Sequence, residues 1–113
     1  MALPMFGWTT FDDRKRDAER KFEHDKELQF KVGARRNKLL GLWAAEQMGM
    51  TGAAADAYAK EVVVSDFERP GDSDVLEKVL GDLTAKGIDA DEHKVRREMD
   101  RLLETAKQQV MAE

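Results

Sequence analysis

Ala34-Arg-Arg-Asn-Lys-Leu-Leu-Gly-Leu-Trp-Ala-Ala-Glu-Gln-Met48 is the stretch with the densest apolar cluster in this chain. On a helix, Leu39, Leu42 and Trp43 share one face through spacings of three and four residues. Leu28 and Val32 continue that face upstream. We therefore expect a helix here that runs to about residue 49 and packs its apolar face into the core of the protein.

Three further segments downstream carry a helical apolar pattern, at about residues 52–68, 74–86 and 90–111. Glycine and proline signals separate the segments, and short connections between helices favour antiparallel neighbours. We predict an all-α fold, a four-helix bundle with a long first helix and a flexible N-terminal arm. The residues expected in its core are Leu39, Trp43, Tyr58, Val62, Leu80, Met99 and Leu102.

Short polar motifs predict where the last two helices begin. Ser73 or Asp74 is expected to cap the third helix, with Glu77 as the partner of Asp74 in a capping box. Asp89 and Glu92 have the same spacing and are expected to open the fourth helix.

Composition excludes several classes of protein. Charged residues make up 37% of the 113 residues, but the net charge is only −4, whereas a nucleic-acid binder needs a basic excess. There is no cysteine, and the longest apolar run, at residues 39–45, is far too short for a membrane span. We expect a cytoplasmic protein that binds no nucleic acid and inserts in no membrane.

The chain upstream of the first apolar cluster is almost solidly charged. Residues 12–31 hold seven acidic and seven basic side chains, and the acid-before-base pairs Asp12–Arg16, Asp17–Lys21 and Glu27–Lys31 have the i,i+4 spacing that supports a helix. The apolar stripe of this segment is thin. We therefore expect two parts: residues 1–21 form an arm that is disordered or fraying when the protein is free, and residues 22–113 form the bundle.

Three motifs resemble one family closely. They are Thr9-Thr-Phe-Asp-Asp-Arg14, Ala34-Arg-Arg-Asn-Lys-Leu-Leu-Gly-Leu-Trp-Ala-Ala-Glu46 and Ala57-Tyr-Ala-Lys-Glu-Val-Val63. They are similar to the zeta subunits that inhibit alphaproteobacterial F-type ATP synthases, and the similarity extends from Thr9 over the rest of the chain. The leader at residues 1–8 departs from the family pattern.

The resemblance implies a four-helix bundle whose N-terminal segment enters a catalytic interface of the ATPase head and blocks hydrolytic rotation. By position, that segment is Thr9 to about Lys21. The implied protein is not an enzyme, has no catalytic residues, cofactor or metal, is a monomer when free, and works at the inner face of the membrane through the ATP synthase. The residues expected to bind the head are Thr9, Thr10, Phe11, Asp12, Asp13, Arg14, Arg16, Ala18, Arg20 and Phe22.

Two other interpretations stay open at this stage. Arg35, Arg36 and Lys38 lie mostly outside the predicted apolar face, so they form either a patch for a phosphate or an acidic partner, or a solvated surface. The alternative function is a small helical bundle that binds a nucleotide or another regulatory ligand. His24 and His93 lie on different predicted helices without a metal-binding spacing, which argues against a zinc site.

Overall fold

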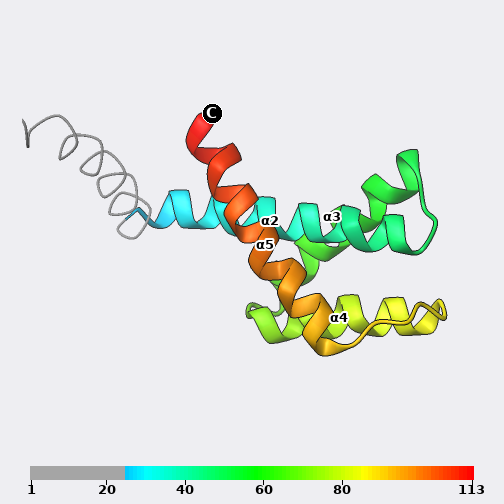
Figure 1. Cartoon of the computed structure of the whole chain (residues 1–113). Coiled ribbons are helices and arrows are strands. Elements are labelled where there is room, and N and C mark those ends of the chain that lie inside the picture. The colour runs from blue at the N-terminus through cyan, green and yellow to red at the C-terminus, as the bar shows by residue number, and fades with distance from the viewer. Residues whose placement is uncertain (1–24) are drawn as a thin grey trace, which may run out of the picture. The chain divides into compact units, whose positions relative to one another are not determined.

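The computed structural model describes residues 25–113 and contains four helices in that part of the chain, with no strand among the described residues. They are labelled as in Figure 1: α2 (Lys26–Gln47), α3 (Gly52–Glu68), α4 (Asp72–Ala85) and α5 (Glu92–Ala112). The predicted all-α, four-helix fold is confirmed. The predicted arm, and any continuation of the first helix upstream of residue 25, lie outside the described residues.

One compact unit begins at Val32 and extends to the end of the chain. Residues 25–31 belong to a separate unit, and residues 26–31 form the first turns of α2. There the Leu28 amide donates to Asp25 Oδ1 at 3.1 Å, and Lys31 Nζ lies 3.7 Å from Glu27 Oε1. The last contact confirms one of the three predicted i,i+4 ion pairs; the other two lie outside the described residues.

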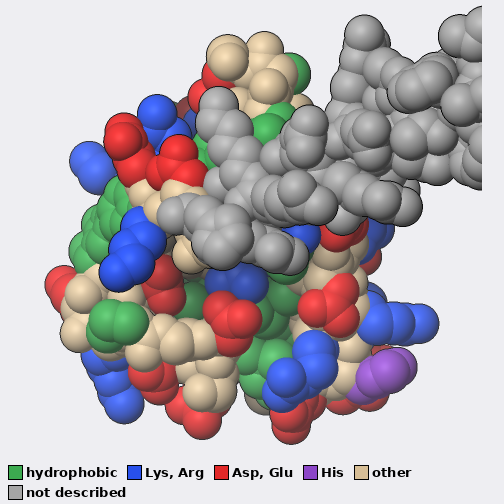
Figure 2. Space-filling model, turned by 90° about the vertical axis from the view of Figure 1, so that its left-hand side faces the viewer, with side chains coloured by type: hydrophobic (Ala, Val, Ile, Leu, Met, Phe, Trp, Pro, Cys, Tyr) green, Lys and Arg blue, Asp and Glu red, His purple; other side chains and the backbone are tan. Residues whose placement is uncertain are grey.

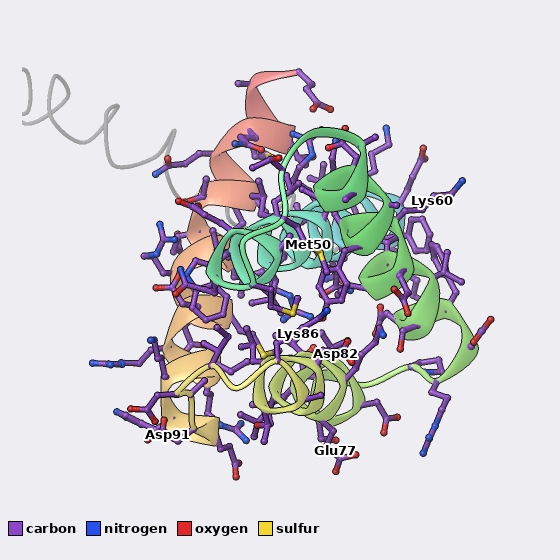
Figure 3. All side chains as sticks on the ribbon, turned by 90° about the vertical axis from the view of Figure 1, so that its right-hand side faces the viewer. Met50, Lys60, Glu77, Asp82, Lys86 and Asp91 are labelled. Carbon is purple, nitrogen blue, oxygen red and sulfur yellow. The ribbon has the colours of Figure 1, made fainter. Side chains whose placement is uncertain are left out.

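The four helices of the compact unit surround a single apolar core. Figure 3 views α2 and α4 nearly end-on, with α5 on one side of them and α3 on the other. α5 therefore crosses α4 instead of running antiparallel beside it, as its short connection had suggested. The core cluster consists of Leu40, Ala44, Ala45, Tyr58, Val62, Val75, Leu76, Val79, Leu83, Val95, Met99 and Leu102.

The buried face of α2 differs from the predicted one. Leu40 and Ala44 are fully buried, whereas Leu39 and Trp43 are only partly buried and pack against the edge of the core. Gly41 explains the difference, because a Cβ atom at that position would lie 2.6 Å from the Ala59 Cα atom. The face of α2 around Gly41, which includes Leu40 and Ala44, thus lies toward the core and lets α3 approach closely, and Leu39 and Trp43 cover the rim of the core.

Of the other five predicted core residues, four are buried and one is only partly buried. Tyr58, Val62, Met99 and Leu102 are buried as predicted, while Leu80 is only partly buried.

The helix ends confirm the glycine signals and correct the predicted caps. Gly49 and Gly87 adopt φ values of 77° and 76°, the left-handed conformation that ends a helix at low cost. α4 begins at Asp72 after Gly71 and has no side-chain cap, so the predicted cap at Ser73 or Asp74 is wrong. Asp91, not Asp89, caps α5, and its Oδ1 accepts from the Lys94 amide at 2.8 Å.

Candidate functional site

The residues predicted to bind the ATPase head, from Thr9 to Phe22, all lie outside the described residues. The other predicted candidates, Arg35, Arg36 and Lys38, lie on α2 and can be placed.

Arg36 is buried, although the apolar pattern predicted that it would point to water. It is 7% exposed, and its Nη2 donates to Asp72 Oδ1 at 2.8 Å at the start of α4. Its Nε and Nη2 also donate to Asn37 Oδ1 at 3.0 and 2.9 Å. The hydrogen bond from Arg36 lowers the pKa of Asp72 below its ordinary value, against the opposing effect of partial burial. Arg36 therefore ties α2 to α4.

Arg35 and Lys38 occupy different surroundings. Arg35 donates from Nη1 to Gln109 Oε1 at 3.0 Å and forms an ion pair with Glu113, so it ties α2 to the end of α5. Lys38 is exposed. A phosphate or an acidic partner held by all three cations would first have to displace Asp72 from Arg36 and Glu113 from Arg35. A binding patch made of these three cations therefore stays a prediction.

A second polar cluster joins α3 to α4. Tyr58 Oη donates to Asp82 Oδ2 at 2.8 Å, and Lys78 Nζ lies 3.1 Å from Glu61 Oε1 and 3.2 Å from Asp82 Oδ2. The Lys78 ammonium also lies 5.6 Å from the centre of the Tyr58 ring, within cation–π range. Asp82 lies on the side of α4 that faces α3, and Glu77 on the opposite side (Figure 3).

The protonation of this cluster follows from its contacts. Burial raises the pKa of Tyr58, and the hydrogen bond to Asp82 raises it further. Burial opposes the charged form of Lys78, but hydrogen bonds to Glu61 and Asp82 outweigh it and raise the pKa of Lys78. Both groups therefore stay protonated near neutral pH and serve as donors. Sequence reasoning missed this cluster, and the i,i+4 spacing of Lys78 and Asp82 was the one signal that could have suggested part of it.

An open groove of about 440 Å³ lies beside this cluster and is lined by residues of α3 together with Lys78 of α4. In the described part of the chain, no group of three or more His, Cys, Asp or Glu side chains could hold a metal ion. None of the described helices is long and apolar enough to cross a membrane. Figure 2 shows acidic and basic side chains interspersed over the face that it presents, without a continuous basic surface.

The family model of ATPase inhibitor subunit zeta matches residues 8–109 of this chain. The chain belongs to this family. The match covers nearly the whole sequence, including the segment from Thr9 that the motifs suggested. The family resemblance noted from the sequence is thereby confirmed.

Among solved structures, the zeta-family chain resembles a protein determined by solution NMR. The two sequences are 52% identical, the match covers 75% of this chain and 96% of the other, and the TM-score is 0.66. No curated protein matches the chain. The polar contacts described above therefore belong to a zeta-family bundle, and they link its helices to one another.

Proposed function

We propose that this zeta-family protein inhibits ATP hydrolysis by an F-type ATP synthase, by inserting its N-terminal segment into the catalytic head of that enzyme. The observation that carries the proposal is the extent of the family match, because residues 8–109 include the whole of the expected inhibitory segment from Thr9 to about Lys21. The protein then acts at the inner face of the membrane through the synthase, as a monomer without catalysis of its own.

The residues of the arm suit such an insertion. Ion pairs at i,i+4 spacing along residues 12–31 favour a helix once one end is held, and the Glu27–Lys31 pair is present in the described part of this stretch. Phe11, Ala18 and Phe22 would supply a narrow apolar face. A narrow face fits a groove between two subunits better than a flat surface.

The bundle has a separate role in this proposal. We place the boundary between arm and bundle near residue 21, as the sequence indicates. The helical unit from Val32 onward has its own apolar core and would remain outside the head, where its bulk limits how deep the arm enters. Arg14, Arg16 and Arg20 would pair with acidic groups in the cleft of the head.

The test uses charged substitutions on the apolar face of the arm. We expect Phe11→Asp combined with Phe22→Asp to raise the concentration needed for half-maximal inhibition of a purified F-type ATPase by about tenfold or more, because two carboxylates would have to be desolvated in the cleft. Gln108→Asp, which adds a carboxylate at an exposed position of α5, is the matched control. Equal inhibition by the double variant and the control would contradict insertion through this face.

A further inference from the structure

The outer side of α3 carries a row of exposed residues with the spacing of a helix-packing face. Ala53, Ala57, Lys60, Val64 and Phe67 follow one another at intervals of four, three, four and three residues, and all five are exposed. We call these five residues the outer row. Alternating steps of four and three place residues on one side of a helix, in the pattern by which two helices pack along a seam. Figure 3 shows Lys60 pointing away from the core.

The outer row is separate from the face that α3 uses for its own fold. Tyr58, Ala59 and Val62 are buried on the inner side of the helix. On the outer side, Val64 is 40% exposed, and Phe67, which also has an interaction within the chain, is 52% exposed. Exposed apolar side chains at these positions bury little surface against the core, so the fold of the bundle does not explain their regular spacing.

The groove described above runs along this row. Ala57, Lys60 and Val64 line it from the outer row, and Glu61, Glu68 and Lys78 line its edge. The alanines make the path shallow, so large apolar side chains of a second helix can lie close to the α3 backbone. Lys60 places one polar group in the row, and a single polar group of this kind fixes the register of paired helices.

The charges beside the row are acidic. Asp56, Glu61 and Glu68 flank the outer row, and all three are exposed. Glu61 pairs with Lys78, which leaves Asp56 and Glu68 as the unneutralised flanks. Residues 52–85 as a whole hold eight acidic and three basic side chains, whereas the net charge of the entire chain is only −4.

We propose that the outer row and its groove form a docking surface for an amphipathic helix of a partner protein, one with large apolar residues in its seam and Lys or Arg on its flanks. Charge complementarity selects this occupant. A second copy of the chain would bring acidic flanks against acidic flanks in either direction of packing, and repulsion of this kind excludes wrong partners. The surface is distinct from the arm, so it would give the protein a second point of attachment.

The test measures binding of two synthetic three-heptad peptides to the full-length protein by fluorescence anisotropy. Both peptides have Leu in the seam; one has Lys and Arg on its flanks and the other has Glu. We expect the basic peptide to bind about tenfold or more tightly than the acidic one and to weaken as the salt concentration rises. Equal binding of the two peptides would overturn the proposal.

Variants locate the site. Val64→Asp and Glu68→Lys should each weaken binding of the basic peptide by about tenfold, because the first places a charge in the seam and the second removes the complementary flank. Gln108→Asp, on the exposed side of α5, should change the affinity for the basic peptide by no more than about twofold. Unchanged binding by both Val64→Asp and Glu68→Lys would refute the assignment, and circular dichroism melting shows that each variant is folded.

Two outcomes would assign the surface to a different occupant and so overturn the proposal. Dimerisation of the protein in sedimentation, abolished by Val64→Asp, would make the occupant a second copy. Tighter peptide binding by the variant with Phe11→Asp and Phe22→Asp would make the occupant the protein's own arm.

Discussion

Gly41 shows how one residue sets the distance between two helices. An added Cβ would lie 2.6 Å from the Ala59 Cα atom and 3.2 Å from its Cβ, and the nearer of these is backbone that cannot rotate away. We expect Gly41→Ala to lower the free energy of unfolding by about 1–3 kcal/mol through overpacking, despite the better helix propensity of alanine.

Gly81→Ala is the matched control for this substitution. Gly81 also lies within a helix, and nothing lies within 4 Å of an added Cβ. Here we expect the free energy of unfolding to rise by about 0.5–1 kcal/mol, because only helix propensity changes. Urea denaturation of both variants measures the two effects, and stabilisation by Gly41→Ala would show that α2 and α3 are not in close contact.

The Arg36–Asp72 pair gives stability that depends on pH. Arg36 lowers the pKa of Asp72 in the folded protein below its ordinary value of 3.8. The folded state then binds the proton less readily than the unfolded state, so the contribution is present above about pH 4 and is lost as the pH falls through the folded pKa.

We expect Asp72→Asn to lower the free energy of unfolding at pH 7 by about 0.5–1 kcal/mol, because the amide oxygen of asparagine can still accept from Arg36 but the charge attraction is lost, and water screens that attraction at the largely exposed Asp72 carboxylate. The difference in the free energy of unfolding between this variant and the unmodified protein should shrink as the pH falls well below 4. Glu77→Gln, on the outer side of α4, is the control and should change little at any of these pH values (Figure 3). A loss with Asp72→Asn that was equal at pH 7 and pH 2.5 would contradict a charged pair.

At the scale of the helices, the start of α5 distinguishes the predicted cap from the observed one. Asp91 accepts from the Lys94 amide, whereas Asp89 lies before the helix and is exposed. Asp91→Ala should lower the free energy of unfolding by about 1 kcal/mol, while Asp89→Ala should change it by less than about 0.5 kcal/mol. Thermal unfolding of the two variants checks this, and the opposite order would restore the predicted cap.

The number and approximate bounds of the helices could be predicted from the sequence, because glycines with positive φ and the apolar periodicity both act locally. The buried face of α2 could not. The spacing of apolar residues favoured the face of Leu39 and Trp43, but packing against α3 selected the neighbouring face with Gly41 and Leu40. Burial of Arg36 was missed for a related reason, because its partner Asp72 lies 36 residues away.

The candidate site depended even more on contacts distant in the sequence. Tyr58 and Asp82 lie 24 residues apart and meet only because α3 and α4 pack together. Four of the five residues in the outer row of α3 are apolar, and they could be separated from the inner face only when the buried residues of α3 were known. Family membership, by contrast, followed from a few motifs.

At the scale of the whole molecule, the proposed function requires a bundle that folds without the N-terminal arm. All residues of the described core cluster lie within the unit at residues 32–113. We expect removal of residues 1–21 to leave the bundle folded. Its helical circular dichroism spectrum and its melting temperature should be nearly unchanged. A large drop in melting temperature would show that the arm contributes to the stability of the bundle.

The most direct measurement of the central claim is the rate of ATP hydrolysis by a purified F-type ATPase at saturating concentrations of the full-length protein and of the same protein without residues 1–21. The account predicts strong inhibition by the full-length protein and none by the truncated one. Equal inhibition by the two proteins would contradict it and would place the inhibitory site on the bundle.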